Sequence, residues 1–436
     1  MKIRIHRGSH QIGGSIVELC TGTTHLFIDF GAALGPGQEE TTDARMIEMM
    51  RSARCDAVLF SHYHGDHTGL LGSLPERDAE GKLIRIGMGK TARRVMQTIH
   101  DTLQSNDRLP EAERRMHRRI SAALSDPARR IDYVSGRSFV VGDFTVTPLL
   151  VDHSAWDAYL FVVEDDGKAV VHTGDFRTHG RLGGTLFDEL GQLLRGKNVS
   201  VLITEGTGMS RLREAVLTES AMEEKAVAVL GRQENRCSFL LCSSTNMESL
   251  ATFANASMRL GRAFYVNDYV YRQIQIYRET AGRDAPAFLF RKTYRLEGMT
   301  RYNPKLRMTQ PSYMRENGFM MLIGVSPAYG KWIDAFRGED PLLIYSLWKG
   351  YVDNTSDAYD ARLGALYHSW RPERRLALHT GGHASAEELT RMIRAVRPRD
   401  RIVPIHTANP EGFAALDLGP YAEKLHLPTD GETLEV

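Results

Sequence analysis

The densest group of metal-binding side chains in this sequence lies at residues 61–67, Ser-His-Tyr-His-Gly-Asp-His. His62, His64, Asp66 and His67 offer nitrogen and oxygen donors that bind divalent cations. So dense a run exceeds the needs of one tetrahedral zinc ion and therefore indicates a two-metal site. His62 and His64 project to the same side of an extended chain, and Gly65 lets Asp66 and His67 turn toward a second position. The chemistry expected of such a site is hydrolysis by an activated water.

Further ligand types occur where other predicted strands end. His153 follows the apolar residues 148–150, Asp175 comes soon after the apolar residues 169–171, and His406 ends a short strand. Taken singly, each is more often a structural histidine or a turn aspartate. Together with residues 61–67 they favour one metal centre, because a strand end presents a side chain from a fixed scaffold.

The elements that must position these residues are predicted as follows. Short strands separated by glycine turns are expected over most of the first half, at residues 2–6, 15–19, 25–29, 56–60, 138–151, 159–163, 169–172 and 199–203. Residues 90–126 are charged and periodic, which predicts helices without indicating their role. Helices at 210–232 and 247–260 alternate with a strand at 238–242, as in a parallel α/β unit, and short strands return at 375–379 and 402–406. The fold class is therefore α/β, with residues 206–375 inserted into a larger α/β body.

Composition narrows the class of protein. The chain has 436 residues, 42% hydrophobic and 25% charged, and a net charge of +1, so affinity for nucleic acid must come from local patches. Neither a signal peptide nor a membrane span is expected, since no apolar stretch is long enough. The cysteines, at positions 20, 55, 237 and 242, form no Cys-x-x-Cys pair, so we expect reduced side chains and a cytoplasmic protein.

With these motifs in order, the sequence resembles the metallo-β-lactamase superfamily and, within it, the β-CASP nucleases, which include ribonuclease J. The superfamily motifs are matched in chain order by Asp29, then His62, His64, Asp66 and His67, then His153, then Asp175. The β-CASP motifs A, B and C are matched by Glu205, His383 and His406. Motif B departs from the usual His-x-Ser-Gly-His because Gly381 replaces the serine, and we expect no counterpart of the C-terminal domain of ribonuclease J.

The resemblance implies an αββα sandwich, residues 1–205 and 376–436, with a β-CASP domain, residues 206–375, inserted as a lid. It implies that one zinc ion is held by His62, His64 and His153, a second by Asp66, His67 and His406, and that Asp175 bridges the two. Asp29 would orient the metal loop rather than bind metal. Manganese is the alternative metal, because Asp66 and Asp175 supply oxygen. Asp66, Glu205 and His383 are the expected catalytic residues, with His383 as a proton donor oriented by Glu205.

The function implied is hydrolysis of phosphodiester bonds in single-stranded RNA, with endonuclease and 5′-exonuclease action both open. Ser243, Ser244 and His383 are the expected substrate contacts. Basic and aromatic residues alternate at Arg291, Arg295, Tyr302 and Lys305 as they do in single-strand grooves, although such a stretch is more often solvated surface charge. Three alternatives remain: cleavage of DNA, hydrolysis of small thioesters or lactams, and a non-catalytic RNA-binding subunit. A homodimer is compatible with the resemblance, and no membrane partner is expected.

Overall fold

The computed structural model describes residues 1–35, 41–212, 216–281, 285–296, 307–356 and 358–436. The chain divides into two compact units, each considered by itself. Unit 1 comprises residues 1–178, 182–215 and 382–436, and unit 2 comprises residues 179–181 and 216–381. The domain boundaries expected from the sequence were 205/206 and 375/376.

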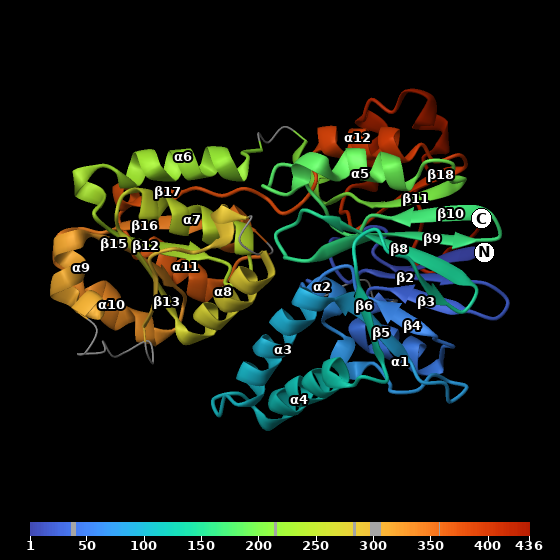
Figure 1. Cartoon of the computed structure of the whole chain (residues 1–436), viewed down its shortest axis with the longest axis horizontal. Helices are drawn as coiled ribbons and strands as arrows, with labels where there is room; N and C mark the ends of the chain where they lie inside the picture. Colours follow the sequence, from blue (N-terminus) through green and yellow to red (C-terminus); the bar gives the residue numbers. More distant parts are fainter. Residues whose placement is uncertain (36–40, 213–215, 282–284, 297–306, 357) are drawn as a thin grey trace. The chain divides into compact units, whose positions relative to one another are not determined.

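Unit 1 contains two β-sheets (Figure 1). The seven-stranded sheet has the order β19-β1-β2-β3-β4-β5-β6. Its strands are β1 (Lys2–Arg7), β2 (Ile16–Cys20), β3 (His25–Ile28), β4 (Ala57–Leu59), β5 (Arg85–Gly89), β6 (Arg130–Tyr133) and β19 (Thr433–Glu435). The six-stranded sheet has the order β18-β11-β10-β9-β8-β7. Its strands are β7 (Phe139–Val141), β8 (Phe144–Val151), β9 (Ala158–Asp165), β10 (Lys168–His172), β11 (Val199–Glu205) and β18 (Arg401–Ile405).

A single apolar layer joins the two sheets, because the strands of both are apolar on the faces they turn to each other. It includes Ile5 and Leu59 from the seven-stranded sheet and Phe161, Val201 and Val403 from the six-stranded sheet, all fully buried. Burying such side chains stabilises the sandwich by about 25 cal/mol per Å² of apolar surface.

Helices cover the outer face of each sheet. The six-stranded sheet packs its other side on α5 (Leu186–Leu193) and α12 (Ala386–Val396), whose Leu190, Leu389 and Ile393 are fully buried. The seven-stranded sheet carries α3 (Lys90–Gln104), which packs on β5, and α4 (Glu111–Ser125), which packs on α3. The unit also contains α1 (Asp43–Ser52) and the short α2 (Gly65–Thr68). These layers are the expected αββα sandwich, and α3 and α4 confirm the helices predicted at residues 90–126.

Unit 2 is built on one parallel sheet of order β14-β13-β15-β12-β16-β17, as the alternation of strands and helices predicted. Its strands are β12 (Cys237–Cys242), β13 (Ala263–Asn267), β14 (Thr293–Leu296), β15 (Phe319–Ile323), β16 (Leu342–Ser346) and β17 (Arg375–Ala377). Its helices are α6 (Glu219–Leu230), α7 (Met247–Arg259), α8 (Asp268–Ala281), α9 (Pro311–Asn317), α10 (Gly330–Ala335) and α11 (Ala361–His368). The helix expected from residue 210 starts at Glu219, because Thr218 caps it, and a 3-10 helix spans Thr207–Arg211.

Within the described part of the chain, no helix combines the length and the hydropathy that crossing a membrane requires. Cys55, Cys237 and Cys242 are buried, and Cys20 is partly exposed.

Candidate metal centre

The candidate ligands of unit 1 follow the carboxyl ends of four strands. His62, His64, Asp66 and His67 come after β4, His153 after β8, Asp175 after β10 and His406 directly after β18. Strands β8, β10 and β18 run in the same direction in one sheet, so their ends meet at one edge. The loop after β4 reaches the same place from the facing sheet, since His67 contacts both Asp175 and His406.

Close backbone packing holds the metal loop against the strand ends. A Cβ on Gly31 would lie 1.7 Å from the carbonyl oxygen of Asp66, so only glycine fits there. Gly174, with φ +54°, lets the chain turn sharply just before Asp175. Asp29 and His406 also adopt positive φ, at +62° and +52°, a conformation that is costly for residues with a side chain and often marks a functional site.

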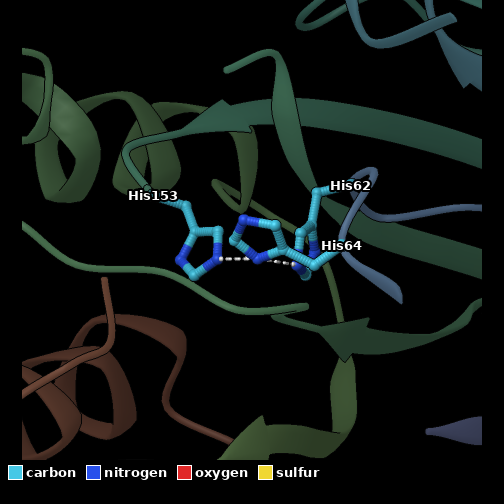
Figure 2. Close-up of side chains that lie close together, drawn as sticks. All are labelled: His62, His64 and His153. Atoms are coloured by element: carbon cyan, nitrogen blue, oxygen red, sulfur yellow. Dashed lines mark hydrogen bonds between the residues drawn. The ribbon is translucent and has the colours of Figure 1, made fainter. Parts of the chain in front are cut away.

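Three imidazoles form the first donor group (Figure 2). His64 Nδ1 lies 3.1 Å from His62 Nε2 and 3.1 Å from His153 Nε2, so the three nitrogens converge on one point. With zinc–nitrogen bonds of about 2.0–2.1 Å, the edge of a tetrahedron is about 3.3 Å, close to these spacings. Burial, followed by the neighbouring imidazoles, holds the pKa of His62 well below its usual value, and burial lowers that of His64 to about 4. The rings are therefore neutral, which is the form that binds metal.

The second donor group joins nitrogen and oxygen. Nε2 of His67 lies 3.3 Å from Nε2 of His406 and 3.1 Å from Oδ2 of Asp175. Oδ2 of Asp66 lies 3.2 Å from Nε2 of His406. Burial would lower the pKa of His67, but the carboxylates of Asp175, Asp29 and Asp66 outweigh burial and raise it well above its usual value. These carboxylates therefore create a negative electrostatic potential at the second donor group, and this potential favours the binding of a cation.

Asp175 supplies the test of whether these residues fit a metal. Its side chain is 2% exposed, and among the described residues only the ring nitrogen of His67, 3.1 Å from Oδ2, lies close enough to donate to it, with poor hydrogen-bond geometry. Burial would raise its pKa, but His406, His67 and His383 outweigh burial and hold the pKa well below its usual value, so the side chain is a carboxylate. A buried carboxylate whose hydrogen-bonding capacity is largely unfilled is costly, and a divalent cation beside it reduces that cost. Asp175 also lies 3.8 Å from Nε2 of His62, between the two donor groups. The residues thus fit a metal centre.

Outer contacts fix the ring orientations. Asp29 Oδ2 lies 2.7 Å from Nδ1 of His67, the Gly382 carbonyl lies 2.5 Å from Nδ1 of His153, and Thr207 Oγ1 lies 2.8 Å from Nδ1 of His406. In each case the contact engages Nδ1, so that Nε2 points toward the donor groups, as is usual around metal-bound histidines. Of these partners only Asp29 was singled out from the sequence, because it matches a superfamily motif, whereas no motif indicated the contacts of Gly382 and Thr207.

Glu205 and His383 lie beside the donor groups. Oε2 of Glu205 is 3.0 Å from Nδ1 of His383, and the same carboxylate accepts backbone N–H groups of Phe176 and Ala384. Burial of the His383 ring would lower its pKa, but Glu205 and then Asp175 outweigh burial and raise it to about 9. His383 is therefore cationic near neutral pH. Its side chain is 24% exposed, against 3% or less for most of the cluster, so the centre opens at His383.

A buried ion pair that the sequence did not indicate links two ligand loops. Nε of Arg177 donates to Oδ1 of Asp152 at 2.7 Å, and the backbone N–H of Arg177 donates to the carbonyl of Asp152. These residues adjoin His153 and Asp175, and both side chains are almost fully buried. The pair holds the loops after β8 and β10 in fixed register.

Ser243 and Ser244, predicted to contact substrate, lie in unit 2 between β12 and α7. Asn246 caps α7, and its side chain accepts the N–H of Ser249. Arg291 and Arg295 are exposed, and Arg295 pairs with Asp268 at 3.1 Å. Tyr302 and Lys305, which belong to the same predicted groove, lie outside the described residues. Substrate contacts therefore stay predictions.

An αββα sandwich with a histidine–aspartate centre at one edge of its sheets defines a class of metal-binding protein. Residues 35–236 match the family model described as "Beta-lactamase superfamily domain". Over these residues the chain is therefore similar to a domain of the metallo-β-lactamase superfamily, whose members are generally hydrolases.

Two relatives extend the comparison. A UPF0282 protein of Thermococcus kodakarensis is 27% identical over an alignment of 234 residues that covers 46% of this chain and 72% of that protein. A solved structure titled as a protein of unknown function from Enterococcus faecalis V583 covers 99% of both chains with a TM-score of 0.72. At 18% identity this second likeness shows the fold alone.

Proposed function

We propose that this protein is a β-CASP-type ribonuclease that hydrolyses phosphodiester bonds of single-stranded RNA with two zinc ions. The observation that carries the proposal is the pair of donor groups, one of three imidazoles and one of mixed ligands, with Asp175 next to both. Two neighbouring sites of this kind suit a phosphodiester, because its negative charge repels a nucleophile until it is neutralised. Manganese is the alternative metal, since Asp66 and Asp175 contribute oxygen.

Divalent cations bound there would acidify a water and neutralise charge on the phosphate. The side chains of the protein would supply the proton that the leaving oxygen needs. Glu205 engages Nδ1 of His383, which leaves Nε2 of the imidazolium to donate a proton to the leaving oxygen. His383 is partly exposed, so a substrate can reach it, whereas Glu205 stays buried and fixes the ring.

The β-CASP assignment is supported by the second unit. A parallel α/β unit formed by residues 216–381 lies in the chain between Glu205 and His383, as the order of motifs in that group requires. A simple lactamase or thioesterase needs neither this unit nor a Glu–His pair beside its ligands. DNA cleavage is disfavoured only by His406, because β-CASP enzymes acting on DNA tend to lack that histidine.

The experiment is a substrate comparison. The purified protein is incubated with 5′-monophosphate and 5′-triphosphate single-stranded RNA, matched DNA, a thioester and a lactam, each with a chelator control. We expect chelator-sensitive cleavage of RNA. Turnover of only the small substrates, or of DNA alone, would replace the proposal with the corresponding alternative. RNA binding without any cleavage by the zinc-loaded protein would point to a non-catalytic subunit.

A further inference from the structure

A second concave site lies in unit 1 at the opposite ends of the strands that carry the metal centre. The cavity has a volume of about 450 Å³, within the range of small-ligand pockets. It is lined where α5 and α12 end and where β11 begins; the lining residues are Gly191, Leu194, Arg195, Gly196, Lys197, Val199, Ala395, Val396, Arg397 and Arg399. Val199 is the first residue of β11 and Glu205 is the last, so the strand separates the cavity from Glu205 by roughly 20 Å.

The charged side chains that line this cavity are all positive. Arg195, Lys197, Arg397 and Arg399 line it, and the lining contains no acidic residue. Lys197 is held by Glu164, whose carboxylate lies 2.8 Å from Nζ. The side chains of the three arginines, by contrast, make no hydrogen bond or ion pair with any residue that the structure describes. Three unpaired guanidinium groups beside one cavity create a positive potential that attracts an anion.

Helix ends explain only part of this charge. Basic side chains are favoured near helix carboxyl ends, where α5 stops at Leu193 and α12 at Val396. That preference accounts for Arg195 and Arg397. It does not account for Arg399, which lies beyond the last turn and whose backbone N–H donates to the carbonyl of Val199. Two chain segments therefore bring unpaired arginines to a shared cavity, and Arg399 exceeds what the end of α12 needs.

The floor of the cavity is apolar. Leu194, Val199 and Val396 are 8%, 4% and 4% exposed and contribute to the core between the six-stranded sheet and its helices. An apolar floor with a guanidinium rim suits a ligand that has a flat apolar part and a phosphate. Arginine is well matched to phosphate because its planar fork can donate two parallel hydrogen bonds.

We propose that this basic cavity binds a nucleotide unit, with its phosphate on Arg195, Arg397 and Arg399 and its base or ribose on the apolar floor. The unit can come from a free nucleotide or from an RNA strand that extends beyond the metal centre. The strand source rests on the proposed ribonuclease function, whereas binding of a free nucleotide does not. The cavity is a binding site and takes no part in cleavage.

Two probes test the inference on the full chain as purified. One is uridine 5′-monophosphate, followed by calorimetry, and the other is a fluorescein-labelled phosphorothioate decauridine, which resists cleavage, followed by anisotropy between 50 and 300 mM salt. The variant is R397A/R399A, with R195A as an independent variant from the α5 side. The matched control is R391A/R394A, which removes the same charge from α12 outside the cavity, where Arg391 covers Phe187 and Arg394 pairs with Asp417.

We expect R397A/R399A to weaken binding of at least one probe about tenfold at low salt, with a smaller loss in R195A and none in the control. For the oligonucleotide, losing two phosphate contacts should also flatten the plot of log K against log salt by about 1.4. Loss of monophosphate binding alone assigns a free nucleotide, and loss of oligonucleotide binding assigns a strand. All exchanged residues are exposed, so melting temperatures should stay unchanged.

The inference is overturned if wild type, cavity variants and control bind both probes equally, or if wild type binds neither. These results are distinguishable from failure of the proposed function, which is absence of RNA cleavage by the zinc-loaded protein. A protein that cleaves no RNA but binds the monophosphate through Arg397 and Arg399 would retain the cavity and lose the ribonuclease.

Discussion

Exchange of Asp29 for asparagine should selectively weaken one of the two metal positions. Asp29 is fully buried and accepts three hydrogen bonds: from the Ser61 N–H at 2.7 Å, from the Ser61 hydroxyl at 2.9 Å and from His67 Nδ1 at 2.7 Å. An asparagine has nearly the same shape and can still accept the Ser61 N–H. Its amide NH₂, however, then occupies the position that faces His67.

The consequence follows from the two nitrogens of His67. In the metal-bound wild type Nδ1 would keep the proton that Asp29 accepts, and Nε2 would give up its own proton to bind a metal beside Asp175 and His406. Opposite an NH₂ group, Nδ1 must accept a hydrogen bond, so the proton moves to Nε2 and blocks the ligand atom. Restoring the binding tautomer would bury two facing donors, at a cost of about 1–3 kcal/mol. That range corresponds to a loss of about 5- to 160-fold in affinity, which brackets the loss of about 10- to 100-fold that is typical for a partner of a metal ligand.

The assay is a zinc titration of the apoprotein against a competing chelator, with metal content measured by mass spectrometry. We expect two classes of site in the wild type and a weakened affinity of one class in D29N, because the group of His62, His64 and His153 does not include His67. The control is D56N, which alters another buried carboxylate, one that accepts the N–H of His25 beside β4. Unchanged affinities in D29N would refute the reasoning, and equal loss of both classes would show general damage to unit 1.

Further outcomes test the remaining assignments. D175A should abolish RNA cleavage and lower bound zinc, and cleavage at wild-type rate would reject the ligand assignment. H383A should keep its zinc and slow turnover by about 10²-fold, and loss of zinc in H383A would contradict its role. The control H426A removes another His–Glu pair, in which His426 lies 2.7 Å from Glu432, and should change neither zinc content nor turnover. Substitution of Arg291 and Arg295 by alanine should weaken RNA binding, measured by fluorescence anisotropy, and the loss should be largest at low salt. An unchanged affinity would show that these arginines do not contact RNA.

Local patterns predicted the elements of this fold well where apolar spacing was clear. The periodic pattern of residues 90–126 predicted α3 and α4, and the apolar runs at residues 15–19 and 25–29 predicted β2 and β3. The start of α6 was misplaced, because capping by Thr218 outweighs the helical pattern before it. The position of the metal loop, residues 61–67, could also be predicted from the sequence, because four ligand-type residues so close together rarely occur without a metal site.

Features made by distant segments could not be predicted in this way. Asp152 and Arg177 form a buried pair, but neither residue type indicates burial from the sequence. Arg195 and Arg399 come together only because β11 and β18 are neighbours, which no local pattern shows. The ligand roles, the metal and the substrate all stay predictions, because the fold brings donors together without specifying what they act on.

The chain leaves unit 1 after residue 215 and returns to it at residue 382, so this unit consists of pieces that are covalently joined only through the other one. His406 belongs to the returning piece, whereas Asp66 and His67 belong to the departing piece. A cation bound by these three side chains would link the two pieces, and the free energy of metal binding would stabilise their association. Proteolytic nicking within residues 216–381 should therefore leave the fragments together in the zinc-loaded protein and separate them more readily after chelation.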